Sequence, residues 1–291
     1  MNTNAQDAAR LLWNCPQSGT VIDALPATLR PADTGAAHAI QAALPAVAGS
    51  AVVGWKIAAT SAAGQAHIQV DGPLPGRILE PFVHSVGTTL SLFGNRMRVV
   101  EPEFAFRMGA GLPTRVTPYA THEVLEAVES MHPAFEVPDS RFADFARVGK
   151  DQLIADDACC GRFAFGPAAP GAWRTIDLSS HPVQAKVFGA DGQLRYMREG
   201  AGRALLGDPL IALTWLANEL SALGIGLQAG DWASCGTCMV PLQIQTGIAC
   251  WPTMACWAPS RSVCLISEGR SAKPGVNPSG RHDCEVGRSR T

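Results

Sequence analysis

The sequence predicts an α+β protein that is rich in β-structure and carries a small helical lobe at its N-terminus. Three observations predict this fold class. Apolar residues recur at helical spacing near the N-terminus, strand-like runs outnumber helical ones in the middle of the chain, and one clear amphipathic helix follows them. The chain has 291 residues, 47% of them hydrophobic, which is enough for one large domain or a domain with a smaller lobe.

The expected elements follow the local patterns in chain order. Residues 4–44 have helical periodicity, interrupted near residues 16–26 by Pro, Gly and Thr. Residues 50–58 are apolar and β-branched and predict a buried strand, and residues 95–108 predict a second, half-buried strand. The remaining expectations are a helix over 121–131 with Thr121 as N-cap, a short extended segment over 133–139, and an amphipathic helix over 209–223.

Composition narrows the class of function. The net charge of −2, from 23 basic and 25 acidic side chains, gives no electrostatic signature of a nucleic acid or an anionic membrane as partner. No run reaches the roughly 18 apolar residues of a membrane span, and the N-terminus does not resemble a signal peptide. Nine cysteines, an odd number, argue against a secreted disulfide framework. We therefore expect a cytoplasmic protein that acts on a small molecule.

A pair of glutamates marks a candidate metal site. Glu101 and Glu103 are two residues apart in a strand-like run, so their side chains point to the same face. If that face is interior, a hard divalent cation with oxygen ligands is the natural way to offset two close anions, and Glu136 or Asp139 could supply a third ligand. The alternative is a pair of solvent-facing glutamates on an edge strand, which Pro102 between them favours.

Lys56 is the second candidate, because the segment around it is otherwise apolar. A buried ammonium has a lowered pKa, which suits proton transfer near neutral pH. The alternative is a lysine whose stem is buried and whose charged end reaches solvent. Other motifs are weak: the glycines of residues 200–207 have neither dinucleotide-binding nor phosphate-loop spacing, and the single Cys-x-x-Cys of residues 235–238 does not make a zinc site.

Six segments in order resemble one known family, the 2-oxopent-4-enoate hydratases and 4-oxalocrotonate decarboxylases of the fumarylacetoacetate hydrolase superfamily. The segments are GWKIAATS (54–61), VVEPEFAF (99–106), AFEVPDSR (134–141), ADDACCG (155–161), GAGRALLGDPLIALTWLANEL (200–220) and GDWASCGT (230–237). The resemblance implies the β-rich fold of the superfamily's C-terminal domain. It also implies a helical lobe over 1–75, a metal-binding catalytic domain over 76–266, and a homo-oligomer.

The resemblance also implies the site and the reaction. Glu101, Glu103 and Glu136 match the ligands of Mg2+ or Mn2+, and Lys56 matches the acid/base position. Glu80 matches an acidic position that assists the water, and Asp139 and Ser140 are placed to orient the metal ligands. The implied substrate is a small 2-oxo or 2-hydroxy-dienoic acid, 2-hydroxypenta-2,4-dienoate, hydrated to 4-hydroxy-2-oxopentanoate. The alternatives are the sister decarboxylase and a non-catalytic or truncated paralogue.

The chain departs from the family in two places. Residues 156–159 read Asp-Asp-Ala-Cys where relatives carry Asp-Asn-Ala/Gly-Ser. After Gly247 the final strand of the family is replaced by a segment rich in Trp and Cys, so we expect the C-terminal strand to be lost or altered. If the codons of residues 248–261 are read one nucleotide earlier, some of the new residues are the same whatever codons are used. These residues form the pattern xxxLAxxGxLG, in which x depends on codon choice, and this pattern matches the family ending. This predicts a single-nucleotide deletion near 247–248 and a disordered, out-of-frame tail over 267–291, and the alternative is a C-terminus specific to this lineage.

Overall fold

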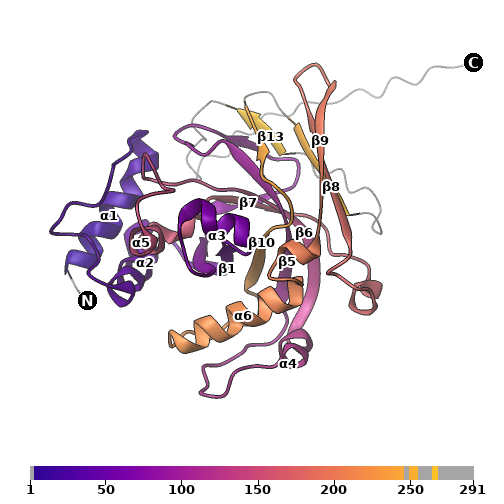
Figure 1. The fold of residues 1–291 in the computed structure, drawn as a ribbon, viewed down its shortest axis with the longest axis horizontal. Coiled ribbons are helices and arrows are strands. Elements are labelled where there is room, and N and C mark those ends of the chain that lie inside the picture. The colour runs from indigo at the N-terminus through magenta and orange to yellow at the C-terminus, as the bar shows by residue number, and fades with distance from the viewer. Residues whose placement is uncertain (1–2, 246–248, 255–263, 268–291) are drawn as a thin grey trace, which may run out of the picture.

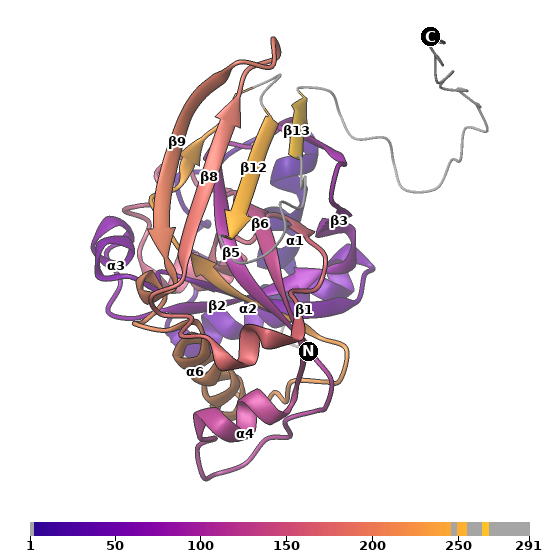
Figure 2. The same cartoon turned by 90° about the vertical axis from the view of Figure 1, so that its right-hand side faces the viewer.

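Two β-sheets and six α-helices form the described part of the chain, which in this computed structural model is residues 3–245, 249–254 and 264–267. The larger sheet has the order β2 (Leu74–Leu79), β1 (Val52–Ala58), β10 (Trp232–Thr237), β5 (Val99–Met108), β6 (Val128–Val137), β7 (Arg162–Phe165) and β3 (Val83–Ser85), and β11 (Leu242–Gln243) also pairs with β5. The smaller sheet has the order β4 (Thr89–Ser91), β13 (Cys264–Ser267), β12 (Ala249–Met254), β8 (Pro182–Phe188) and β9 (Leu194–Ala201) (Figures 1 and 2).

The helices lie around the larger sheet. They are α1 (Thr3–Ser18), α2 (Thr34–Ala48), α3 (Ala62–Ile68), α4 (Thr121–Glu126), α5 (Lys150–Ala155) and α6 (Pro209–Ala222). In Figure 1, α1, α2 and α5 lie together at the end of the molecule that holds the N-terminus, and α4 and α6 lie together below the sheet. None of these helices is long and apolar enough to cross a bilayer.

The N-terminal helices have their own apolar core. Ala8, Leu12, Ile40 and Leu44 are buried there together with Phe142, which comes from much later in the chain. The chain segment before residue 75 also contains β1, which pairs with β10 and β2 in the larger sheet. A division of the chain at residue 75 therefore stays a prediction.

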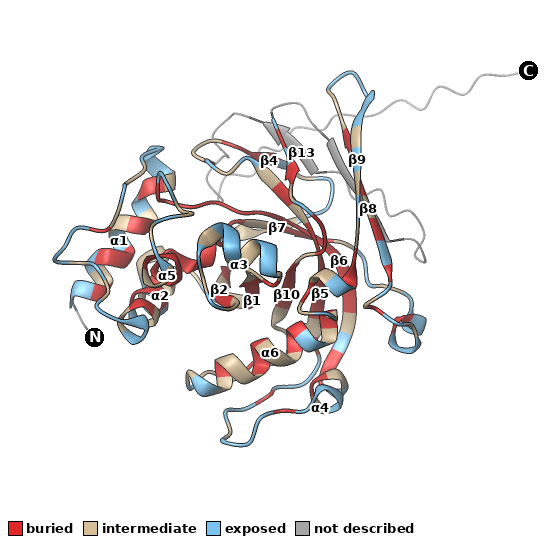
Figure 3. Cartoon of the chain, in the orientation of Figure 1, coloured by how far each residue is buried: buried red, intermediate tan, exposed pale blue. Residues whose placement is uncertain are grey.

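Buried residues are concentrated along β5 and β6 at the middle of the larger sheet, whereas α3 and the turn between β8 and β9 are mostly exposed (Figure 3). The interpretation of β5 as an edge strand is wrong, because β10 and β6 flank it on both sides. Pro102 is tolerated there because it faces β10 where the register of β10 with β5 shifts, between Ser234 and Thr237. Its carbonyl oxygen accepts from Cys238 N at 3.0 Å. The backbone N–H that proline lacks would point to this same interrupted side.

Two further expectations need correction. The helix predicted over 121–131 ends at Glu126, and β6 begins at Val128 and takes in residues 133–137 of the short extended segment predicted over 133–139. Helical spacing of apolar residues cannot distinguish a helix from a strand that is buried on both faces, as β6 is. The first residue of α4 is Thr121 itself, so the residue at the N-cap is Ala120.

The segment after Gly247 forms strands where the sequence predicts that the last strand is lost or altered. β12 pairs with β8 from Ala249 to Met254, and β13 pairs with β4. A strand backbone is thus retained, because backbone pairing does not require alternating side chains. The side chains of these strands, the predicted frame change at 247–248 and the predicted tail from 268 onward lie outside the described residues.

Close packing of β1 on β10 makes a specific demand on Gly54. A Cβ atom added at this residue would lie 2.3 Å from the carbonyl oxygen of Trp232. We expect Gly54→Ala to lower the free energy of unfolding by about 3 kcal/mol, because overpacking against a backbone cannot relax by a rotamer change. Urea denaturation measures this. Gly72→Ala is the control, since nothing lies within 4 Å of its added Cβ, and equal midpoints for both variants would contradict the prediction.

Candidate functional site

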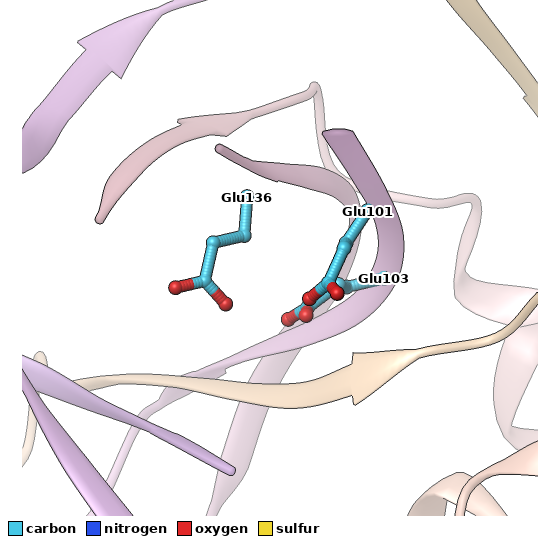
Figure 4. Close-up of side chains that lie close together, drawn as sticks. All are labelled: Glu101, Glu103 and Glu136. Carbon is cyan, nitrogen blue, oxygen red and sulfur yellow. The ribbon is translucent and has the colours of Figure 1, made fainter. Parts of the chain in front are cut away.

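Three carboxylates converge in the middle of the larger sheet. Glu101 and Glu103 extend from one face of β5, and Glu136 lies on the neighbouring strand β6, directly opposite Glu101 in register. One oxygen from each of the three lies within 4.8 Å of the others. Figure 4 shows the three side chains directed toward a common space. The spacing of two along a strand and the pairing of neighbouring strands together produce this arrangement.

The cluster carries more negative charge than its surroundings balance. Glu103 and Glu136 are fully buried and Glu101 is half-buried. Burial raises the pKa of Glu101 to about 7, with a further contribution from the charge of Glu136. Burial and the neighbouring carboxylates also raise the pKa of Glu103, and burial raises that of Glu136. Three close carboxylates that resist ionisation are typical of a site completed by a cation.

Lys56 is the cation that contacts this cluster. Its Nζ lies 3.2 Å from Glu136 Oε2 and donates a hydrogen bond to the carbonyl oxygen of Ala158 at 3.0 Å. Only 3% of Lys56 is exposed, so the interpretation of a lysine that reaches solvent is wrong. The expected lowering of its pKa is also wrong: burial does lower the pKa, but the carboxylates, Glu136 above all, outweigh burial and raise it. The sequence could not show how many anions would surround the ammonium.

Each buried glutamate has one oxygen held by a neutral donor. Glu136 Oε1 accepts from Gly161 N at 3.1 Å, and Glu103 Oε2 accepts from the hydroxyl of Ser234 and from Gly236 N. Within the described residues, the other oxygen of Glu103, Oε1, is buried without a hydrogen-bond partner. An orphaned carboxylate oxygen in an all-oxygen cluster fits a hard divalent cation such as Mg2+, Mn2+ or Ca2+ better than it fits Zn2+.

A strained turn presents the carbonyl that holds Lys56. Asp157, Ala158 and Cys159 have φ values of 57°, 52° and 59°, three successive non-glycine residues in the left-handed region. Such residues cost of order 1 kcal/mol each and persist where the surrounding structure requires them. Asp157 Oδ1 accepts from Arg77 N at 2.7 Å, which ties this turn to β2. Asp157 and Cys159, the residues at which the sequence is expected to depart from the resemblance, are buried parts of the turn that faces Lys56.

The residues before this turn form a buried network. Arg141 Nε lies 3.1 Å from Asp156 Oδ1, and Ser140 donates to Asp156 Oδ2 at 2.6 Å. Asp139 Oδ1 accepts from Arg96 N at 2.7 Å. Asp139 and Ser140 therefore bond to neighbouring segments, and their predicted orienting of the metal ligands stays a prediction.

Glu80 is the predicted site residue that the structure does not bring to the cluster. It is exposed and begins a short 3-10 helix (Glu80–Phe82) after β2. In the pairing of β1 with β2, Lys56 lies opposite Gly76, four residues before Glu80. At a rise of about 3.3 Å per residue, four residues place the Cα atom of Glu80 roughly 13 Å along the chain from the position opposite Lys56. Its predicted assistance to the water molecule stays a prediction.

Sequence reasoning missed Ser234 and Gly236 as parts of the site. Both lie in the segment GDWASCGT, in which the resemblance assigns a role to neither residue. A usable signal was present, because a serine in the middle of an otherwise apolar buried strand must find a hydrogen-bond partner.

The pKa directions predict how stability depends on pH when no metal is bound. Glu101 has a pKa of 4.5 as a free side chain and about 7 in the fold, so between these values the native state binds more protons than the unfolded state. The free energy of unfolding should therefore fall as pH rises from about 5 to about 8. Saturating Mg2+ should reduce this fall, because the cation displaces the protons of the cluster, while the part due to Asp156 and Asp157, whose pKa values burial raises to about 6 and about 7, remains. Urea denaturation with EDTA or with Mg2+ measures it, and equal slopes would contradict the prediction.

Comparison with known proteins agrees with this geometry. The chain is 34% identical over 230 residues to a 2-keto-4-pentenoate hydratase of Paraburkholderia xenovorans (strain LB400), which covers 78% of this chain and 82% of that one. No family model matches the chain. Its fold is similar to the 4-oxalocrotonate decarboxylase of Pseudomonas putida G7 complexed with magnesium and adipate, with a TM-score of 0.79 at 22% identity over 91% of this chain and 98% of that one.

A more distant likeness places the fold in a wider group. A fumarylacetoacetate hydrolase from Exiguobacterium antarcticum matches with a TM-score of 0.53 at 17% identity, over 75% of this chain and 76% of that chain. The predicted α+β fold of the fumarylacetoacetate hydrolase type is confirmed. The sequence of this chain is 34% identical to that of the Paraburkholderia hydratase over 82% of the hydratase, and this similarity assigns the family. The chain belongs to the family of the 2-keto-4-pentenoate hydratases.

Proposed function

We propose that this protein is a metal-dependent hydro-lyase that adds water to 2-hydroxypenta-2,4-dienoate and forms 4-hydroxy-2-oxopentanoate in aromatic catabolism. The observation that carries the proposal is the buried cluster of Glu101, Glu103 and Glu136 with Lys56 in contact. Relatives at 34% identity that are named as 2-keto-4-pentenoate hydratases support the substrate class.

The three glutamates would hold Mg2+ or Mn2+. Such a cation supplies a positive charge that stabilises the anion developing on the 2-oxo acid. Neutral donors fix one oxygen of Glu103 and one of Glu136, so these two side chains are already oriented before a ligand binds. The raised pKa values mean that cation binding must also displace protons from the cluster.

Lys56 would carry the proton. An ammonium has three N–H donors: one donates to the Ala158 carbonyl, and the charged group pairs with Glu136 Oε2 at 3.2 Å. A further N–H can deliver a proton to carbon 5, and the amine then takes up the proton that the 2-hydroxyl loses as the dienol becomes a ketone. When water adds, the ammonium gives a proton to carbon 3 and recovers one from the water that bonds to carbon 4. Glu80 would assist the water molecule.

The test is to incubate purified protein with 2-hydroxypenta-2,4-dienoate and follow the dienol absorbance. The proposal predicts a loss of absorbance that requires Mg2+ or Mn2+, is abolished by EDTA, and yields 4-hydroxy-2-oxopentanoate. A parallel assay with a 2-oxo dicarboxylate measures release of carbon dioxide. Decarboxylation without hydration would favour the sister activity, and metal binding without either reaction would favour a non-catalytic paralogue.

We also propose that the chain assembles as a homo-oligomer and acts in the cytoplasm. Both rest on the resemblance to the family. Light scattering coupled to size exclusion measures the number of subunits, and a single-chain mass would contradict the first proposal. Fractionation of the source cells tests the second.

A further inference from the structure

An irregularity in β10 lies beside the metal-ligand cluster. β10 runs between β1 and β5, with Ser234 paired to Lys56 on one side and to Ala105 on the other. The register then shifts, so that three residue steps along β10, from Ser234 to Thr237, face two steps along β5. A bulge of this kind redirects the groups that it contains.

Gly236 makes the bulge possible. Its φ of 88° is in the left-handed region, and an added Cβ would lie 2.7 Å from Thr60 Oγ1 and 2.9 Å from the Ile57 carbonyl. In this conformation Gly236 N donates to Glu103 Oε2 at 3.3 Å, and the hydroxyl of Ser234 donates to the same oxygen. The bulge therefore directs two donors at a single carboxylate oxygen.

The two oxygens of Glu103 consequently differ. Oε2 accepts two hydrogen bonds, whereas Oε1 is buried and, as far as the chain is described, has no hydrogen-bond partner. Ser234 is itself fully buried, so its hydroxyl cannot be replaced by bulk water. Glu136 is oriented differently, by the backbone N–H of Gly161, which no side-chain substitution removes.

From this asymmetry we infer that Ser234 is a positioning residue for the cation site, which fixes Glu103 so that it offers Oε1 alone to the ion. The inference rests on the proposed function and refines it. Ser234 touches no reacting atom in this arrangement and acts through Glu103. Without the hydroxyl, the carboxylate keeps only the longer bond from Gly236 N and must be ordered when the cation binds, which weakens affinity.

The test measures binding of Mn2+ without substrate, by electron paramagnetic resonance of the free ion, for the wild type, Ser234→Ala and Ser234→Cys. We expect about 10- to 100-fold weaker binding for Ser234→Ala and an intermediate loss for Ser234→Cys, because a thiol is a weaker donor of similar size. Ser221→Ala is the matched control. It removes a hydroxyl that bonds to the backbone of Arg115 at the C-terminal end of α6, and its affinity should stay within about twofold of the wild type.

Hydration kinetics provide the second measurement. For Ser234→Ala, the Mn2+ concentration needed for half-maximal rate should rise by the same factor as the dissociation constant, while kcat at saturating Mn2+ stays close to that of the wild type. Wild-type affinity in Ser234→Ala, or a fall in kcat that excess Mn2+ does not restore, would overturn the inference. If Ser234→Ala does not fold, Ser234→Cys decides by the same criteria.

The binding measurement also separates this inference from the proposed function. A wild type that binds Mn2+ but does not hydrate the dienol contradicts the proposed reaction, while the affinities of the Ser234 variants still decide the role of Ser234. A wild type that binds no Mn2+ overturns both.

Discussion

Replacing Glu103 with glutamine is expected to remove catalysis and to stabilise the metal-free protein at the same time. Glutamine keeps the size of the side chain, and its carbonyl can still accept from Ser234 and Gly236, but an amide replaces the orphaned oxygen. We expect kcat/KM to fall on the order of 1,000-fold, about 4 kcal/mol of transition-state stabilisation. The free energy of unfolding in EDTA should rise by about 1–2 kcal/mol, because a buried carboxylate with a raised pKa has been removed.

Enzyme kinetics and urea denaturation in EDTA measure the two effects. Glu129→Gln is the matched control, since Glu129 is an exposed residue of β6 that lies outside the cluster. A loss of activity without a gain in metal-free stability would mean that the carboxylates do not repel one another as the geometry implies. Full activity of Glu103→Gln would show that Glu103 is not a metal ligand.

Replacing Lys56 with methionine should separate proton transfer from cation binding. The kcat should fall about 100- to 10,000-fold, as when a general acid/base is removed. The metal-free protein should lose about 3–5 kcal/mol of stability, because Glu136 is left buried without its partner. Affinity for Mn2+ should not fall, since the ammonium and the metal ion compete for the same carboxylates.

Lys150→Met is the control for this substitution. Lys150 pairs with Asp71 at 2.6 Å, but both side chains are exposed, and such pairs contribute about 0–1 kcal/mol. Kinetics, Mn2+ titration and denaturation of the two variants form one comparison. A Lys56→Met protein that keeps activity within tenfold of the wild type would exclude Lys56 as the proton carrier.

Some features of the candidate site can be predicted from local sequence alone. The spacing of Glu101 and Glu103 predicts a shared face, because a strand alternates with a period of two whatever its neighbours are. Lys56 is notable as the charged residue of an apolar strand. That Glu136 lies opposite Glu101 depends on the register of β5 with β6, which the sequence of either strand does not specify.

The misplaced elements have a common physical cause. The helix expected over 121–131 and the edge position expected for Pro102 were both inferred from local preference, and packing on both sides of β5 and β6 decided otherwise. The pKa of Lys56 was predicted from burial alone, whereas its direction is decided by the carboxylates of two other strands. Neighbours distant in the chain outweigh local preference at each of these positions.

By itself, the sequence determined the β-rich α+β class, the family, and the residue types of a hard-cation site with a lysine beside it. Only the tertiary structure decided that the three carboxylates meet, that Lys56 remains charged among them, that Glu80 is exposed after the end of β2, and that Ser234, beside a bulge in β10, donates to Glu103. Periodicity and residue type are local properties of a chain. Strand register, burial and the sum of nearby charges arise only when separate segments pack together.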